Sequence, residues 1–161
     1  MNILLACIGN TCRSPMAAGL LRRLAQEVGL EHIDVKSAGL SAWSGQPVSQ
    51  HSVTAMQWRG VDISDHTATS LTEPLIRWAD LILVMTSGHK RQLQDTPGIE
   101  GKLYTLGEYA AKLAPTSGSS QEYGDVPDPI GQPLAAYEET AEHLERLLRI
   151  IVESLKTGEE Q

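Results

Sequence analysis

Cysteine, long apolar runs and positive charge are all scarce in this chain. Its 161 residues include two cysteines, which can form one disulfide at most, so a small secreted scaffold held by disulfides is excluded. No apolar run approaches the roughly 20 residues of a membrane-spanning helix. Asp and Glu number 20 against 13 Lys and Arg, for a net charge of −7. This balance argues against non-specific binding to nucleic acid or to an anionic membrane.

The spacings that mark metal centres and nucleotide-binding loops are missing too. The five histidines include no pair one helical turn apart, so we interpret them as surface or hydrogen-bonded core residues. A zinc site formed by Cys7 and Cys12 lacks a second, closely spaced pair of ligands and is a remote alternative. No Gly-Lys-Ser/Thr triplet follows Gly9, so the first loop is not a Walker loop.

The remaining composition is that of a soluble globular protein, with 41% hydrophobic and 20% charged residues. A chain of this length predicts a single domain over residues 1–161, with a core large enough to fold without metal or disulfides. The first residues lack the basic segment and the full apolar stretch of a signal peptide. We therefore expect a cytoplasmic protein with reduced thiols, and we expect it to be a monomer.

Short apolar runs alternate along the chain with segments of helical periodicity. Residues 3–6, 33–35, 81–85 and 103–106 have the length and composition of strands. The third run is apolar without alternation, as expected for a strand buried on both faces of a parallel sheet. The alternation predicts a doubly wound α/β fold.

Four helices are expected between and after these strands. The first carries an apolar residue at every fourth position from Met16, and Ser14 followed by Pro15 offers an N-cap with proline at the first helical position. A second helix ends at Gly60, and Thr72 opens a short third one. A long final helix has its apolar stripe from Tyr137 onward, and we expect its polar end, residues 156–161, to be frayed.

Two loops are candidates for function. The longest irregular stretch runs from about residue 115 to residue 133, and structureless loops of that length are often binding loops or lids. In doubly wound sheets, ligands bind beyond the carboxyl ends of the strands. The loop after the first strand, which begins at Cys7, is therefore the first place to expect chemistry.

That first loop has the composition of an anion site with a nucleophile. Its backbone N–H groups can surround an anion at the positive end of the following helix, and Gly9 and Asn10 tolerate left-handed backbone angles. Arg13 offers a planar fork of donors for two phosphate oxygens. The same field favours the thiolate form of Cys7, and Ser14 can donate a hydrogen bond to it. The residues of the loop expected to bind the anion are Ile8, Gly9, Asn10, Thr11, Cys12 and Ser14.

A thiolate beside an anion cradle and an arginine suggests nucleophilic displacement at phosphorus through a cysteinyl-phosphate. Two plainer interpretations stay open on the residues alone. Cys7 can be an ordinary core cysteine, and a cradle without turnover can serve as a module that binds phosphorylated residues. The presence of a nucleophile, an arginine and an acidic candidate together favours the enzyme.

The loop Cys7-Ile8-Gly9-Asn10-Thr11-Cys12-Arg13-Ser14-Pro15 resembles that of the low-molecular-weight protein-tyrosine-phosphatase family, Cys-x-Gly-Asn-x-Cys-Arg-Ser-Pro, at every position. Further landmarks agree along most of the chain: Ser37-Ala38-Gly39, the segment 79–85 and Asp128-Pro129. The resemblance implies a three-layer fold with a four-stranded parallel sheet between helices, no metal and no cofactor. It also implies phosphorylated protein substrates and inorganic phosphate as the product.

The resemblance further implies a role for each residue of the motif. Cys7 is expected to be the nucleophile, Arg13 to bind phosphate, Asn10 to hold the shape of the loop and Ser14 to orient the thiolate. Asp128, before Pro129, is expected to be the general acid. A carboxyl group must be partly desolvated to hold a proton at neutral pH, which a closing loop can achieve.

Two of these assignments have alternatives. Asp125 is a rival for the acid, although it lies three residues before the family position. Cys12 either packs the cradle or captures an oxidised Cys7 as a disulfide.

Two departures from the tyrosine-specific pattern bear on the substrate. Thr11 stands where tyrosine phosphatases commonly carry a bulkier aliphatic residue, and its hydroxyl can accept a hydrogen bond from a guanidinium. Ile130 and Gly131 follow Asp128-Pro129 where tyrosine enzymes often have an aromatic pair. The threonine resembles the bacterial protein-arginine-phosphatase branch, and the aromatic wall of the tyrosine enzymes is missing, so phosphoarginine is favoured over phosphotyrosine.

Two further features bear on the substrate, and the first of them, Trp43, counts against the preference for phosphoarginine. Trp43 is expected to line the cleft and to stack on a phenol ring or a guanidinium, with a surface tryptophan as the alternative. Arsenate reductases of this fold relay oxidation through additional cysteines downstream. The chain has only Cys7 and Cys12, so arsenate reduction by such a relay is excluded.

Overall fold

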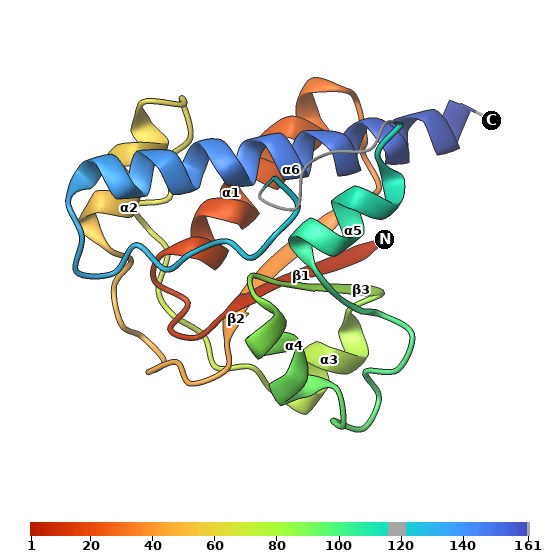
Figure 1. The fold of residues 1–161 in the computed structure, drawn as a ribbon, viewed down its shortest axis with the longest axis horizontal. Helices are drawn as coiled ribbons and strands as arrows, with labels where there is room; N and C mark the ends of the chain where they lie inside the picture. Colours follow the sequence, from red (N-terminus) through yellow and green to blue (C-terminus); the bar gives the residue numbers. More distant parts are fainter. Residues whose placement is uncertain (116–121, 161) are drawn as a thin grey trace.

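The computed structural model describes residues 1–115 and 122–160, and its centre is a sheet of four strands (Figure 1). All pairs of neighbouring strands are parallel, in the order β2-β1-β3-β4. The four strands are β1 (Asn2–Cys7), β2 (Asp34–Gly39), β3 (Leu81–Val84) and β4 (Leu103–Thr105). The order reverses direction between β1 and β3, which is the switch point where such sheets bind ligands.

Helices cover both faces of this sheet (Figure 1). On one face α1 packs on β1, and α6 packs across α1, α2 and α5, while α3 and α4 lie on the opposite face. Their bounds are α1 (Arg13–Glu27), α2 (Gln50–Gln57), α3 (Glu73–Trp78), α4 (Ser87–Leu93), α5 (Leu106–Leu113) and α6 (Leu134–Glu160). The expected three-layer α/β fold with a four-stranded parallel sheet is confirmed.

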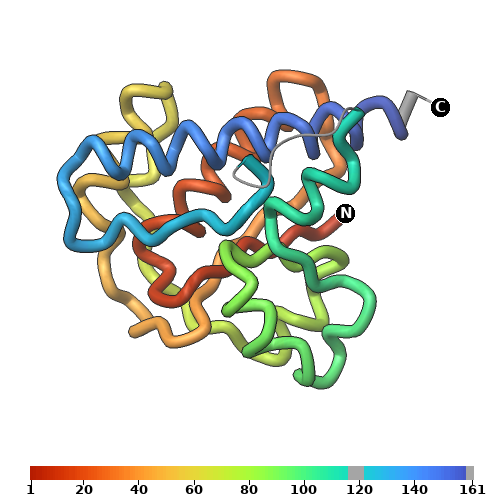
Figure 2. Tube along the Cα trace, in the orientation of Figure 1, coloured from red at the N-terminus to blue at the C-terminus, as the bar shows by residue number. Residues whose placement is uncertain are grey.

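Successive side chains of β1 point to opposite faces of the sheet and so divide the core into two clusters. Ile3, Leu5 and Cys7 point toward α1 and α6, whereas Leu4 and Ala6 point toward α3 and α4. β1 is buried from its second residue onward and β3 is wholly buried, which is why β3 shows no polar alternation in the sequence. The tube in Figure 2 shows how this arrangement brings the loop after β1 and the segment before α6 to the same edge of the sheet.

Several expected boundaries differ from the structure. The N-cap of α1 is Cys12 and not Ser14, because the Ser14 hydroxyl bonds to Cys7 and Asn10 inside the first turn instead. Of the two residues that tolerate a left-handed backbone, Asn10 adopts it, with φ of 56°, and Gly9 does not. The final helix does not fray at residue 156 but continues to Glu160.

Two helices escaped the sequence prediction. α4 has only seven residues, and α5 begins at Leu106, which the apolar pattern had assigned to the preceding strand. Both begin at threonine caps, Thr86 and Thr105, a signal that is clear only once the strand ends are known. Of the long stretch 115–133, residues 116–121 lie outside the described part of the chain.

Candidate active site

The loop between β1 and α1 lies at the carboxyl edge of the sheet and alternates between buried and accessible residues. Cys7 and Arg13 are 3% and 4% exposed, and Asn10 and Ser14 are fully buried. Ile8, Gly9 and Thr11 are half-buried. Because α1 has no side-chain cap at Cys12, the first backbone N–H groups of that helix remain suited to an anion.

Two donors surround the sulfur of Cys7. The backbone N–H of Asn10 donates to Sγ at 3.3 Å, and the Oγ of Ser14 lies 3.0 Å from the same sulfur. Ser14 Oγ already accepts a hydrogen bond from Asn10 Nδ2 at 2.7 Å, so its own hydrogen is available to the sulfur. This is the environment that a thiolate requires, since it can only accept.

Asn10 holds the loop in place from its centre. Its Nδ2 group also donates to Ser37 Oγ at 3.0 Å, and its Oδ1 accepts from the backbone N–H of Thr69 at 2.9 Å. Its backbone carbonyl lies 2.9 Å from His66 Nε2. A left-handed backbone is costly for most residues but tolerated by asparagine. These bonds fix the loop against the end of β2 and the 66–69 segment.

The geometry of the loop explains why Ser37 and Gly39 stand in the Ser37-Ala38-Gly39 segment. Gly39 lies opposite Cys7 in the sheet register, and a Cβ atom there would lie 2.6 Å from the carbonyl oxygen of Ile8. Only glycine allows β2 to approach the loop so closely. Ser37, two residues earlier, supplies the hydroxyl that accepts from Asn10.

Arg13 joins the cradle to the loop that precedes α6. Its Nη1 donates to the carbonyl of Val126 at 2.9 Å, and its Nη2 lies 3.4 Å from Asp128 Oδ2. The Nε donor is buried and has no partner within residues 1–115 and 122–160. A buried guanidinium with a spare donor is ready to bind an oxyanion.

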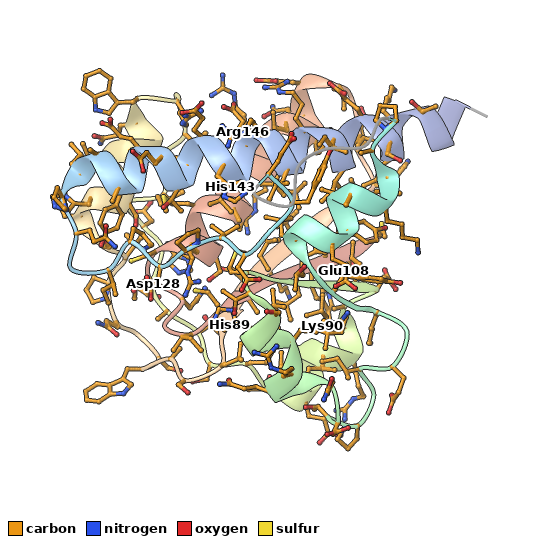
Figure 3. All side chains as sticks on the ribbon, viewed as in Figure 1. His89, Lys90, Glu108, Asp128, His143 and Arg146 are labelled. Atoms are coloured by element: carbon orange, nitrogen blue, oxygen red, sulfur yellow. The ribbon has the colours of Figure 1, made fainter. Side chains whose placement is uncertain are left out.

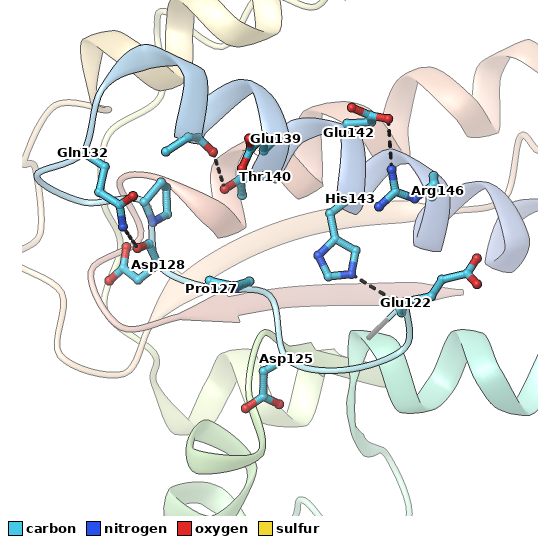
Figure 4. Close-up of a pocket in the computed structure, with 12 residues that line it drawn as sticks. Glu122, Asp125, Pro127, Asp128, Gln132, Glu139, Thr140, Glu142, His143 and Arg146 are labelled. Carbon is cyan, nitrogen blue, oxygen red and sulfur yellow. Dashed lines mark hydrogen bonds and ion pairs between the residues drawn. The ribbon is translucent and has the colours of Figure 1, made fainter. Parts of the chain in front are cut away.

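The loop before α6 is tied to the corner between β3 and α4. Val126 N–H donates to the carbonyl of Met85 at 2.9 Å. The Asp125 carboxylate accepts from Ser87, at 2.8 Å from its backbone N–H and 3.3 Å from its hydroxyl. Figure 4 shows Asp125 directed away from α6, toward α4. The structure thus gives Asp125 an anchoring contact and places Asp128 beside Arg13.

Asp128 sits at the rim of the cradle. Its side chain is 43% exposed, and its Oδ1 accepts from the backbone N–H of Ile130 at 3.1 Å. Ile130 is itself 65% exposed. Beyond Asp128 lies a polar groove of about 630 Å³ between this loop and α6 (Figure 4). Its lining includes Asp128 but neither Cys7 nor Arg13, so the groove borders the cradle without containing it.

Cys12 faces a tyrosine behind the cradle. Its sulfur lies 3.8 Å from Tyr137 Oη and 3.8 Å from Thr11 Oγ1. Burial raises the pKa of Tyr137, and the hydrogen bond from Cys12 acts in the same direction. The Tyr137 ring packs edge-on against His51, with centroids 5.1 Å apart. Cys7 and Cys12 are both free thiols.

Two histidines at the site were missed by the sequence analysis, because no ligand spacing marks them. His66 contacts the Asn10 carbonyl, and burial lowers its pKa. His89, on α4, is 6% exposed and its Nδ1 is buried without a partner in the described ranges. It was expected to be a surface or hydrogen-bonded core residue, and for Nδ1 that expectation is wrong. The one available signal was its place just after a buried strand, at the edge where ligands bind.

Trp43 lies in the loop between β2 and α2, and its side chain is 81% exposed. Its backbone carbonyl accepts from Gln46, and the neighbouring Gly45 donates to Ala68. The loop is therefore tied to the 66–69 segment that also supports Asn10, while the indole ring stands in solvent.

Metal-binding clusters and membrane-spanning helices are both absent from residues 1–115 and 122–160. No group of three or more His, Cys, Asp or Glu side chains there could hold a metal ion. Within the same ranges, no helix has both the length and the apolar character needed to cross a bilayer.

A parallel sheet whose first strand ends in a cysteine, inside an anion cradle with a buried arginine and an adjacent aspartate, defines the class of cysteine-dependent phosphatases. The model of the family "low molecular weight phosphotyrosine protein phosphatase" matches residues 2–161. The chain belongs to this family, whose members are hydrolases that act on phosphorylated proteins through a cysteinyl-phosphate.

Proteins similar to this chain include both arginine phosphatases and tyrosine phosphatases. The chain is 38% identical to a protein-arginine-phosphatase of Bacillus subtilis (strain 168), over 97% of each protein. It is 41% identical to a probable low-molecular-weight protein-tyrosine-phosphatase, EpsP, of Ralstonia nicotianae, over 89% of this chain and 88% of the other. A solved mutant of the YwlE arginine phosphatase with a phosphorylated active-site serine matches with a TM-score of 0.84 and 36% identity, over 97% and 96% of the two chains.

Proposed function

We propose that this chain is a protein-arginine phosphatase in which Cys7 is the nucleophile, Arg13 the phosphate clamp and Asp128 the general acid. The observation that carries the assignment is the sulfur of Cys7, set between the N–H of Asn10 and the hydroxyl of Ser14 at the mouth of a helix. The product is inorganic phosphate. We propose further that the protein works as a monomer of one domain in the cytoplasm, where the free thiols of Cys7 and Cys12 stay reduced.

In the first chemical step the Cys7 thiolate attacks phosphorus, and the bond between phosphorus and the departing nitrogen breaks. That nitrogen takes the electron pair of the broken bond and receives a proton from Asp128, so the leaving group departs as the guanidinium of an arginine side chain. Arg13, with its spare Nε donor, and the N–H groups of the loop bind the equatorial oxygens as charge builds on them. Ile8, Gly9, Thr11 and Cys12 contribute to this ring.

In the second step water attacks the cysteinyl-phosphate, Asp128 accepts a proton from that water, and the sulfur of Cys7 leaves as a thiolate. The hydroxyl of Ser14, 3.0 Å from Sγ, stabilises the departing sulfur in this step as it did the attacking one. The side chain of Asn10 takes no direct part and acts by fixing the loop, whereas its backbone N–H donates to the sulfur.

Residues around the site and one similar protein favour phosphoarginine over phosphotyrosine. Thr11 is half-buried at the rim of the loop, with a hydroxyl that can accept from a guanidinium. Ile130 replaces the aromatic wall that a phenol ring would stack on, and Asp128 carries a carboxylate suited to a guanidinium. Trp43 is exposed, and we propose that it stacks on the flat guanidinium of the substrate. A relative over nearly the whole chain is an arginine phosphatase.

The test compares kcat/KM on one protein phosphorylated on arginine and a matched protein phosphorylated on tyrosine. We expect wild type to prefer phosphoarginine by at least about tenfold, which corresponds to about 1.4 kcal/mol of transition-state binding. We expect Thr11→Ile to lose this preference and Cys7→Ser to be inactive on both. A preference for phosphotyrosine that Thr11→Ile leaves unchanged would return the chain to the tyrosine phosphatases.

Ser44→Ala is a matched control for the loop that carries Trp43. Ser44 contacts Ser70 on the surface, one residue from Trp43, and its replacement should leave both rates unchanged. Trp43→Ala should raise KM for the phosphoarginine protein more than it lowers kcat. Equal effects of Trp43→Ala and Ser44→Ala would contradict a role for Trp43 in substrate binding.

A further inference from the structure

His89 is a buried side chain that the proposed mechanism does not use. It is 6% exposed, and its Nδ1 has no hydrogen-bond partner among residues 1–115 and 122–160. Buried polar atoms are nearly always paired, so an unpaired one at the edge of a functional site calls for an explanation. The backbone N–H of His89 is satisfied by Thr86, the N-cap of α4, so the question concerns the ring alone.

The ring lies where three parts of the site meet. Figure 3 shows His89 on α4 in the same region as Asp128. Asp125 binds the first turn of that helix through Ser87, and the same loop continues to Asp128, which pairs with Arg13. His89 thus lies on the helix that this loop contacts, close enough to Arg13, Asp125 and Asp128 for their charges to act on its ring.

The charges around the ring set its protonation state. Arg13 of α1 disfavours a second cation, whereas Asp125 and Asp128 of the loop favour one. Lys90, next to His89 on α4, is paired with Glu108 of α5 at 2.7 Å. Burial is the largest influence and, with Arg13, lowers the pKa of His89 below its usual value. The imidazole is therefore neutral at neutral pH while the charge of Arg13 is uncompensated by a ligand.

Binding of a tetrahedral dianion would reverse this balance, because it adds two negative charges beside Arg13. We propose that His89 is a positioning residue that takes up a proton when a phosphate-sized dianion binds at Arg13. The proton comes from solvent and adds to the ring nitrogen that lacks one, while no other bond changes. The positive charge of the imidazolium then offsets part of the added negative charge. It also keeps Arg13 and Asp128 in position around the dianion. This inference rests on the proposed anion site at the cradle.

By linkage, the affinity for a dianion depends on pH in a defined direction. The bound state holds the proton more tightly than the free state, so the affinity is highest at low pH. The affinity falls as the pH rises through the His89 midpoints of the free and of the dianion-bound protein. Above both midpoints the affinity is constant. The cysteinyl-phosphate is also a dianion on the cradle, so His89 would hold its proton through the covalent intermediate and give it up when phosphate leaves.

The direct test is an NMR titration of isotopically labelled histidines in Cys7→Ser, with and without saturating sulfate. Sulfate is a tetrahedral dianion that does not itself titrate between about pH 5.5 and 8, and the serine removes the titration of the nucleophile. Without sulfate, we expect the His89 midpoint to lie below the usual histidine pKa of about 6.5. We expect sulfate to raise it by about one pH unit and to leave His32 unchanged.

A second readout separates coupling from a merely structural role. Across a pH range that spans the two His89 midpoints, the sulfate affinity of Cys7→Ser should fall by up to about tenfold for a midpoint shift of about one pH unit. The Cys7→Ser, His89→Gln double variant should show a flat profile, whereas Cys7→Ser, His32→Gln should follow its parent. A His89→Gln substitution that only loosens the fold would lower the affinity at every pH and keep the slope.

The outcomes distinguish the two proposals. Sulfate that shifts none of the amide signals of residues 7–14 would overturn the anion site itself. Sulfate that binds there without moving the His89 midpoint would overturn the role of His89 and leave the phosphatase assignment intact.

Discussion

Asn10 shows how one residue sets the geometry of the site. It combines a left-handed backbone with side-chain bonds to Ser14, Ser37 and the backbone of Thr69. Nearly every polar atom of this side chain is used, and the residue is fully buried. The sequence motif predicted that Asn10 holds the shape of the loop. It did not name the partners, because Ser37 and Thr69 come from distant segments that only the fold brings together.

Asn10→Ala should therefore reduce both stability and turnover. It removes three side-chain bonds and puts alanine into a left-handed backbone, so we expect unfolding to need about 2–4 kcal/mol less free energy. We expect kcat to fall at least about tenfold, because the N–H that faces Cys7 moves with the loop. Urea unfolding and steady-state kinetics measure the two effects.

Asn2→Ala is the matched control at the other end of β1. Asn2 Nδ2 donates one bond to the Trp78 carbonyl at 2.9 Å, far from the cradle. Its loss should cost about 1 kcal/mol and leave kcat unchanged. If both substitutions lowered kcat alike, the role of Asn10 in the loop would be contradicted.

At the scale of elements, the site is built where the ends of β1 and β3 meet the loop before α6. β1 and β3 were predictable because both faces of each are buried, which leaves an unbroken apolar run. α4 was not, since seven residues hold too little periodicity to distinguish a helix from a loop. The role of His89 stayed hidden for the same reason, because its place depends on α4 and on a loop 36 residues further along the chain.

Asp125 gives a prediction at this scale. Its carboxylate binds Ser87 at the start of α4, and this contact positions the loop that carries Asp128. We expect Asp125→Ala to cost about 1–2 kcal/mol of stability. It should lower kcat on phosphoarginine several-fold more than kcat on an aryl phosphate whose leaving group needs no proton, since only the first depends on Asp128 as an acid.

Asp62→Ala provides the comparison for that substitution. Asp62 accepts from the backbone and hydroxyl of Ser64 in an exposed turn, a contact of the same type outside the site. It should leave the ratio of the two kcat values as in wild type. If Asp125→Ala also left the ratio of kcat on phosphoarginine to kcat on the aryl phosphate unchanged, the loop would be positioned without Asp125.

The whole molecule should lose stability on mild acidification. His66 and His89 both have a folded-state pKa below the usual 6.5, with burial as the main cause. The unfolded chain therefore binds more protons in this window, and stability present above about pH 6.5 is lost as the pH falls toward the folded-state values. Each pH unit of separation removes about 1.4 kcal/mol.

Urea unfolding at pH 7.5 and 5.5 measures this loss. His66→Gln and His89→Gln should each reduce the difference between the two pH values, whereas His32→Gln, at an exposed position, should not. Glu108 belongs to a lower window, since its bonds to Lys90 and Thr105 hold its pKa below the usual 4.5 despite burial. A stability that stays constant from pH 7.5 to 5.5 would contradict neutral, buried histidines at the site.

The central claim is that Cys7 carries the phosphoryl group and that Asp128 serves both chemical steps. The most direct measurement is rapid quenching of Asp128→Asn during turnover of an aryl phosphate, followed by mass spectrometry of the peptide that contains Cys7. The account predicts one phosphoryl group on Cys7 in most molecules, because loss of the carboxylate slows attack by water more than attack on a substrate with a good leaving group. Rapid turnover with an unmodified Cys7, or a phosphoryl group on another residue, would contradict it.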